Sequence, residues 1–133
     1  MVGKGRGVQL GNEATEGCSR KRDVERRTAV FADRIIQLVF TLPSNVVGWE
    51  LGRQLVRAGM SVGANVEEAQ AAESTADFLH KMRIARKECR ETKYFLMRIA
   101  NATLIPKASV EAVTEEAGQI TRILTAIILN TRD

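Results

Sequence analysis

The sequence has little of what builds strands, disulfide frameworks, metal centres or membrane spans. Its 133 residues include two prolines, one histidine, two cysteines and only 5% aromatic residues. Two cysteines, Cys18 and Cys89, form no disulfide framework and cannot supply four zinc ligands, which favours a cytoplasmic location. No run approaches the roughly 18 apolar residues of a membrane span, and the first residues lack the apolar stretch of a secretory signal. We therefore expect a cytoplasmic protein without a membrane segment.

Recognisable catalytic and metal-binding patterns are also missing. Di-iron helical bundles need Glu-x-x-His on two helices, whereas the single histidine, His80, follows Asp77 in one Asp-x-x-His. No G-x-S-x-G, P-loop or Rossmann pattern is present. We interpret His80 as a surface residue and Cys89 as a small buried hydrophobe rather than a nucleophile. The sequence therefore predicts a protein that is not an enzyme and that carries no metal or cofactor.

Apolar residues at helical spacing are what the sequence has in abundance. Hydrophobic residues make up 44% of the chain, and from Thr28 onward they recur at alternating spacings of three and four. This spacing is typical of the seam between nearly antiparallel helices. The four seams are Phe31, Ile35, Leu38 and Leu42; Leu51, Leu55, Ala58, Val62, Asn65 and Ala69; Phe78, Met82, Ala85, Cys89, Thr92, Leu96 and Ile99; and Val110, Val113, Ala117, Ile120, Leu124 and Ile127.

Capping residues and prolines set the expected ends of the helices. Ser44 is placed to cap the second helix, Ser74 and Asp77 have capping-box spacing, and Pro106 suits the first turn of the fourth helix. Connections this short force neighbouring helices to run antiparallel. The fold class predicted is therefore all-α, an up-down-up-down four-helix bundle with helices near 28–42, 45–72, 75–103 and 107–131.

The first residues differ from the rest in charge and glycine content. Residues 1–27 hold seven basic groups, four acidic groups and five of the ten glycines, without apolar periodicity. We interpret residues 1–27 as a flexible basic arm and residues 28–133 as the bundle. Such an arm either holds phosphates or is a solvated tail, and a start codon assigned too early gives the same composition.

Some apolar residues lie outside the four seams. Ile36 and Phe40 do so in the first helix, and Ile84 and Phe95 lie within about 20° of each other on the third. Either the core stripe is wide, or a second face is buried between subunits. We favour the second reading, which predicts a homo-oligomer with Ile36, Phe40, Ile84 and Phe95 at its interface.

Glycines gather in the second helix. Gly48, Gly52, Gly59 and Gly63 each cost roughly 1 kcal/mol relative to alanine in a helix interior. We expect close packing of another helix of the bundle against them to offset that cost.

The third helix carries a basic stripe. Arg83, Arg86, Arg90 and Lys93 fall within about 80° of arc with Lys87 beside them, whereas the acidic residues of this segment lie on another side. The stripe predicts contact with successive phosphates of RNA or DNA. The alternative is an ordinary solvated face, which the net charge of +1 on residues 28–133 favours. Because Tyr94 is the one aromatic residue nearby that could stack on a base, we expect backbone contact rather than base-specific readout.

Residues 55–96 resemble the bacterial four helix bundle protein family, whose founding members are encoded by intervening sequences in large-subunit ribosomal RNA genes. The resemblance covers residues 28–131. The matching elements are Arg57-x-x-x-Ser61-Val62, Ala64-Asn65-Val66-Glu67-Glu68-Ala69, Ser74-x-x-Asp77-Phe78, Lys81, Ile84-Ala85, Glu88, Glu91-Thr92 and Tyr94-x-Leu96. The chain departs from its relatives at Phe95, where many have tryptophan, and at Cys89, where small residues are usual.

This resemblance implies an antiparallel four-helix protomer, a barrel-like homopentamer and no enzymatic activity. More distant relatives include the accessory subunit of diversity-generating retroelements, a basic pentamer that binds reverse transcriptase and nucleic acid. The resulting hypothesis is a non-enzymatic oligomeric bundle that binds RNA or DNA backbone through Arg83, Arg86, Lys87, Arg90 and Lys93. The alternative is a protein-interaction scaffold, such as an accessory subunit for a reverse transcriptase.

Overall fold

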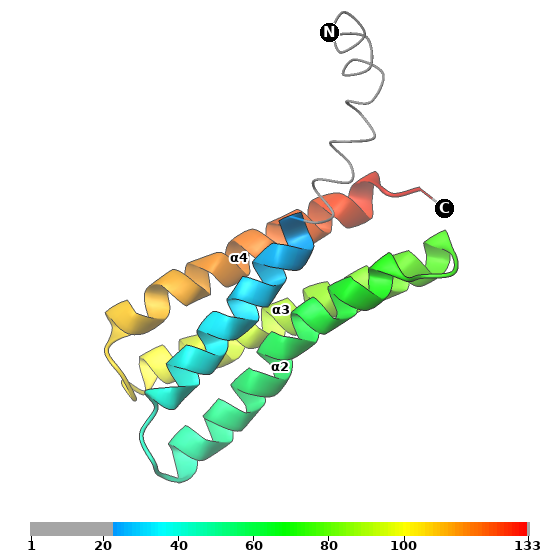
Figure 1. Cartoon of the computed structure of the whole chain (residues 1–133). Coiled ribbons are helices and arrows are strands. Elements are labelled where there is room, and N and C mark those ends of the chain that lie inside the picture. The colour runs from blue at the N-terminus through cyan, green and yellow to red at the C-terminus, as the bar shows by residue number, and fades with distance from the viewer. Residues whose placement is uncertain (1–22, 133) are drawn as a thin grey trace, which may run out of the picture.

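The computed structural model describes residues 23–132, which form four α-helices and, within that range, no strand. The first helix covers residues 23–40, and it is followed by α2 (Val46–Gln70), α3 (Thr75–Asn101) and α4 (Lys107–Asn130). Figure 1 shows that each helix runs antiparallel to the one before it. The predicted all-α, up-down-up-down four-helix bundle is therefore confirmed.

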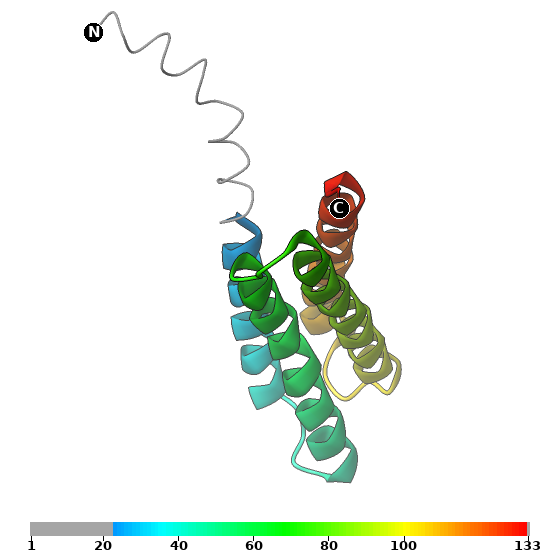
Figure 2. The ribbon, with the colours of Figure 1, turned by 90° about the vertical axis from the view of Figure 1, so that its right-hand side faces the viewer.

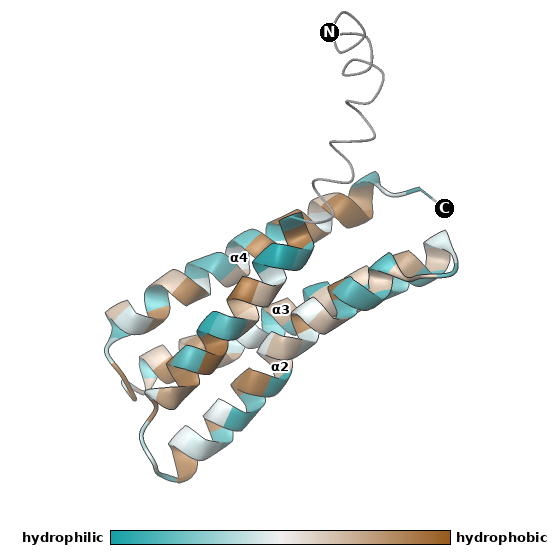
Figure 3. Cartoon of the chain, in the orientation of Figure 1, coloured by the Kyte–Doolittle hydropathy of each residue, from teal (hydrophilic) through white to brown (hydrophobic). Residues whose placement is uncertain are grey.

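The helices pack as two pairs around one core. In Figure 2 the first helix lies beside α2, and α3 lies beside α4. Bands of apolar and hydrophilic residues alternate along each helix in Figure 3, as expected of amphipathic helices. Most predicted seam residues are buried, while Leu42, Leu51, Phe78 and Ile127 are partly buried against the same core. Val66 and Leu79, which lie outside the predicted seams, are also buried.

The first helix begins before the predicted boundary between arm and bundle at residues 27 and 28. The first helix already includes residues 23–27, Val24 is buried in the core, and Thr28 is fully buried. The Thr28 hydroxyl donates hydrogen bonds to the carbonyls of Val24 and Glu25 at 2.8 and 3.0 Å. Val24 and Thr28 continue the seam of Phe31, but the surrounding charged residues hid that continuation. The other residues of the predicted arm lie outside the described range.

The observed N-terminal cap agrees with the sequence prediction for α3 and differs from it for α2 and α4. Ser74 caps α3 as predicted, because its hydroxyl accepts a hydrogen bond of 3.0 Å from the Asp77 amide. Asn45, rather than the predicted Ser44, caps α2 and accepts from the Gly48 amide at 2.8 Å. Pro106 precedes the first turn of α4 as its N-terminal cap residue instead of lying within that turn.

Two of the four glycines, Gly52 and Gly59, let the first helix approach α2 closely, as predicted, whereas a Cβ atom at Gly63 would make only ordinary contact with Thr28 at 3.4 Å. A Cβ atom at Gly59 would lie 3.0 Å from side-chain carbons of Ile35, and one at Gly52 would lie 3.2 Å from Val39. Those distances are shorter than comfortable van der Waals contacts, so these positions favour glycine. Gly48 has a different reason, because a Cβ there would collide with the backbone carbonyl of Pro43 in the preceding turn.

The turn between α3 and α4 places a threonine where glycine is preferred. Thr103 has φ of 53°, and its amide donates to the carbonyl of Ala100 at 3.1 Å. The amide of Leu104 donates to the carbonyl of Ile99 at 3.3 Å, which completes a Schellman motif with Thr103 in the left-handed position. A β-branched residue is strained in this conformation.

We predict that Thr103→Gly raises the free energy of unfolding by about 1 kcal/mol. The substitution removes a strain of about 1–2 kcal/mol, and this gain exceeds the cost of the unfolded-state entropy that glycine adds. The melting temperature should rise by about 4–6 °C in a thermal scan. The control is Ala102→Gly, at a neighbouring residue with φ of −79°, which should lower the melting temperature. An unchanged or lowered value for Thr103→Gly would contradict the assigned strain.

Candidate nucleic-acid interface

The edge of α3 that faces α2 is occupied by ion pairs. Arg57 of α2 lies 3.4 Å from a carboxylate oxygen of Glu88 and makes a second, shorter ion pair with Glu91. The hydrogen bond that Arg57 donates to the Glu91 carboxylate raises the pKa of Arg57 and outweighs the opposing effect of burial. Lys81 pairs with Glu68 at 3.2 Å. Acidic side chains on this edge of α3 are therefore neutralised by α2 and do not face the basic stripe.

The edge of α3 that faces α4 is basic. The guanidinium of Arg86 donates a long hydrogen bond of 3.5 Å to the Thr125 hydroxyl. Lys93, two turns further along α3, lies beside Gly118, which is two turns earlier on α4. Both pairs follow one antiparallel register, so α3 presents Arg86 and Lys93 to the same side of α4.

The outer face of α3 carries the remaining predicted residues. Arg83, Lys87 and Arg90 are exposed. Within residues 23–132, no carboxylate lies within 4.0 Å of the charged groups of these three side chains, of Arg86 or of Lys93. The structure therefore brings all five residues predicted to bind nucleic acid onto one continuous surface, from the outer face of α3 to its border with α4. Their role in binding stays a prediction.

Tyr94 lies on the same outer face but is already engaged. Its side chain is 57% exposed, and its ring makes an edge contact with Phe95 at a centroid distance of 5.8 Å. The guanidinium carbon of Arg98 lies 5.0 Å from the centre of the Tyr94 ring. This cation–π contact covers one side of the ring, which leaves less of it for stacking on a base.

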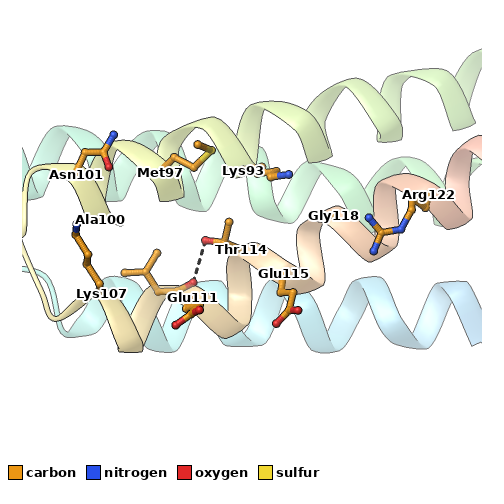
Figure 4. Close-up of a pocket in the computed structure, with 11 residues that line it drawn as sticks. Lys93, Met97, Ala100, Asn101, Lys107, Glu111, Thr114, Glu115, Gly118 and Arg122 are labelled. Carbon is orange, nitrogen blue, oxygen red and sulfur yellow. Dashed lines mark hydrogen bonds between the residues drawn. The ribbon is translucent and has the colours of Figure 1, made fainter.

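A groove between α3 and α4 borders this surface and contains basic residues that the sequence analysis missed (Figure 4). It has a volume of about 670 Å³, and its lining includes Lys93, Lys107, Gly118 and Arg122. Lys107 and Arg122 belong to α4, so their place beside α3 follows from the packing of the two helices. No periodicity within one helix could have grouped them with Lys93.

The four residues predicted to form a subunit interface differ in exposure. Ile36, Ile84 and Phe95 are partly buried within the protomer, and Phe95 packs against the core. Phe40 is 78% exposed. It belongs to a larger exposed apolar set around the turn between the first helix and α2, which we name the turn cluster. The turn cluster consists of Phe40, Val46, Val47 and Trp49.

Residues considered for catalysis occupy structural or surface positions. Cys89 is fully buried, and its thiol donates a hydrogen bond of 3.2 Å to the Ala117 carbonyl. Burial raises the pKa of the Cys89 thiol and outweighs the opposing hydrogen bond from Thr121, which is unfavourable for a thiolate nucleophile. His80 is exposed, as predicted. Among residues 23–132, no cluster of three or more histidine, cysteine or acidic side chains is placed to hold a metal ion.

Within residues 23–132, no helix combines the length and the apolar character that a membrane span requires.

Comparisons with known proteins agree on one family. A model described as 23S rRNA-intervening sequence protein matches residues 20–126. Among solved structures, a protein of unknown function from the S23 ribosomal protein family of Bacteroides thetaiotaomicron is 32% identical, with a TM-score of 0.77. The alignment covers 84% of this chain and 99% of that protein. Comparison with curated proteins finds no match.

The buried thiol predicts a pH dependence of stability. Above the ordinary thiol pKa of 9.0, an unfolded Cys89 loses its proton while the folded one keeps it, because burial raises its pKa. The unfolded state then binds fewer protons, so the free energy of unfolding falls as pH rises, by at most about 1.4 kcal/mol per pH unit. Cys89→Ala should lack this part of the loss.

Urea unfolding of wild type and Cys89→Ala between about pH 7.5 and pH 10.5 measures the difference. Other titrating groups, Cys18 included, are common to both proteins and cancel in the comparison. Two curves that stay parallel above pH 9 would show that Cys89 ionises equally in the folded and unfolded states.

Proposed function

The chain belongs to the 23S rRNA-intervening sequence protein family, and from this membership and the basic surface of α3 we propose that it is a non-enzymatic, oligomeric protein that binds nucleic-acid backbone. The surface comprises Arg83, Arg86, Lys87, Arg90 and Lys93. The partner that fits it best is structured RNA, bound in the cytoplasm. The family description connects relatives with ribosomal RNA genes, which supports RNA as the first nucleic acid to test.

The observation that carries the proposal is the separation of charges on α3. Glu88 and Glu91 are held by Arg57 on the α2 side, and Glu88 is only 14% exposed. The five basic residues face outward or toward α4 with no carboxylate of the described chain within 4.0 Å. If the outer face of α3 were an ordinary solvated face, Glu88 and Glu91 would be interspersed among its basic residues and would neutralise them. The charge that remains is therefore available to an external anion.

The shape of the surface favours phosphate contacts over reading of bases. The five residues span Arg83 to Lys93, ten residues apart, which is about 15 Å along the helix axis at 1.5 Å per residue. That length meets several successive phosphates of a duplex. In A-form RNA the major-groove base edges lie in a deep, narrow groove that side chains cannot read, and proteins recognise the duplex largely by its backbone and shape.

We predict that the double reversal Arg83→Glu/Arg90→Glu abolishes measurable binding to a structured RNA hairpin at low salt. Wild type should bind with an affinity that falls as salt rises, because each neutralised phosphate releases counterions. Fluorescence anisotropy of a labelled hairpin over about 25–200 mM salt gives both the affinity and the salt slope.

The matched control is Arg26→Glu/Arg53→Glu, which changes the net charge by the same amount. Both side chains are 76% exposed, and among residues 23–132 each forms an ion pair only with a carboxylate three residues away on its own helix. Wild type that shows no salt-dependent binding refutes the proposal. Equal losses in the two double variants would show that net charge, and not the α3 surface, controls binding.

Self-association is the second part of the proposal, and a second copy of the chain is the occupant we assign to the turn cluster. Phe40 was expected at an interface, and Val46, Val47 and Trp49 extend it into one exposed apolar end of the bundle, with Trp49 65% exposed. Apolar and aromatic residues of this kind are typical of buried interface cores. The resemblance to four helix bundle proteins implies five copies, which would multiply the phosphate contacts of one protomer.

We predict that light scattering after size exclusion gives wild type a mass of five times the 14.7 kDa chain, and that Phe40→Ser/Trp49→Ser lowers it. Removing two large apolar side chains from an interface core should shift the equilibrium toward protomers. Leu129→Ser is the control, because Leu129 is 76% exposed and belongs to the last turn of α4, whose C-terminal end lies at the opposite end of the bundle from the turn between the first helix and α2 (Figure 1). A wild-type mass of one chain would refute self-association, and an unchanged mass in the double variant would refute this interface.

A further inference from the structure

Gly118 of α4 is a glycine of a described helix that no close contact with another helix explains. Glycines 52 and 59 of α2 admit the first helix, and Gly48 avoids the carbonyl of Pro43. A Cβ atom at Gly118 would meet nothing closer than 3.8 Å, so alanine fits there without moving any neighbour. Glycine in the middle of α4 is nevertheless the less stable choice for a helix. Some other requirement therefore has to account for the open backbone at this position.

Two cationic groups converge over Gly118. The Nζ atom of Lys93 and the Nη1 atom of Arg122 each lie 3.8 Å from the point that a Cβ atom would occupy. The two nitrogens are therefore no more than about twice that distance apart. They come from different helices, and within the described residues neither has a carboxylate within 4.0 Å. Like charges placed this close repel each other, and an anion between them would offset that repulsion.

The acidic residues of the same groove do not fill this position. Glu111 and Glu115 line the groove from the same helix as Gly118, but no atom of either side chain lies within 4 Å of the Cβ position of Gly118. The open space above Gly118 thus faces two cations from two helices and bare backbone beneath. This combination is suited to an anionic group that approaches the helix closely.

We propose that Lys93 and Arg122 clamp one backbone phosphate of the bound nucleic acid directly above Gly118. This inference rests on the proposed function and extends it, because it assigns Arg122 and Gly118 of α4 to the interface. Phosphate oxygens accept charge-assisted hydrogen bonds of about 2.7–2.9 Å from lysine and arginine, so one phosphate bridges both groups. The absence of a Cβ atom leaves the space that this phosphate occupies.

A nucleic-acid phosphate fits the site better than a free one because the site continues the α3 surface. Lys93 is the last residue of that surface, and Arg86 lies two turns before it on the same edge. A strand that follows Arg86 and Arg90 along α3 toward Lys93 reaches Gly118 by crossing the border to α4. The groove is open along this border and is lined by both helices.

The test uses two single variants of the full chain, Arg122→Ala and Gly118→Ala, with the labelled RNA hairpin. Each should weaken binding by about three- to tenfold at about 0.1 M salt, and Arg122→Ala should lower the salt slope by about one. Gly118→Ala should also raise the melting temperature by about 3–6 °C, since alanine is the better helix former. A variant that is more stable and binds more weakly cannot owe its loss to unfolding.

Arg53→Ala is the matched control for loss of one exposed arginine, and its binding should stay within twofold of wild type. If Gly118→Ala binds as tightly as wild type, the site above Gly118 is refuted even where Arg122→Ala binds more weakly. If both variants bind as wild type while Arg83→Glu/Arg90→Glu does not, this inference fails and the proposed function stands. Wild type that fails to bind the hairpin refutes both.

A separate titration with inorganic phosphate distinguishes the two sources of the anion. The amide signals of Gly118 and its neighbours are followed by nuclear magnetic resonance in wild type and Arg122→Ala at constant ionic strength. Shifts that saturate at low millimolar phosphate in wild type and vanish in Arg122→Ala would assign the site to free phosphate and overturn the nucleic-acid assignment. Weak shifts that do not saturate, together with the losses in hairpin binding, support it.

Discussion

The burial of the apolar seam of α3 between α2 and α4 is the constraint on which the surface of this protein depends. Met82, Cys89 and Leu96 are fully buried, and burying them fixes the rotation of the helix about its axis. Once that rotation is set, Glu88 and Glu91 meet Arg57 of α2. The five basic residues from Arg83 to Lys93 then have only the solvent and α4 left to face. The charge pattern outside is thus a consequence of the packing inside.

The packing of α3 on α4 also determines what lies at their border. Cys89 approaches the Ala117 carbonyl at 3.2 Å, so small residues at this contact bring the two helices close together. The antiparallel register that places Arg86 at Thr125 places Lys93 at Gly118. A larger buried residue at position 117 would separate the helices and move Lys93 away from Arg122. The geometry of the proposed phosphate clamp therefore depends on the buried contact beneath it.

The sequence predicts the four helices and the α3 surface because both follow from periodicity within one helix. Burial requires apolar residues every three or four positions, and that pattern is legible at Phe31, Leu55 and Leu96. It was not legible at Val24, whose neighbours are almost all charged. Gly118 and Arg122 could not be found in this way, since their relation to Lys93 depends on which residues of α3 and α4 face each other. Only the packed structure determines that register.

Net charge is a poor guide to this surface because it adds charges that do not act at the same place. Residues 28–133 carry 13 basic and 12 acidic groups. If these charges were spread evenly over the surface, they would leave almost no net electrostatic field. Opposite charges cancel only within roughly a Debye length, about 8–10 Å near physiological salt, and a helix with its side chains is about as wide. Glu68, Glu88 and Glu116 are paired with Lys81, Arg57 and Arg27 at the borders between helices. An anion approaching the outer face of α3 therefore meets Arg83, Lys87 and Arg90 before it meets any of those acids, and the local charge rather than the sum decides whether it stays.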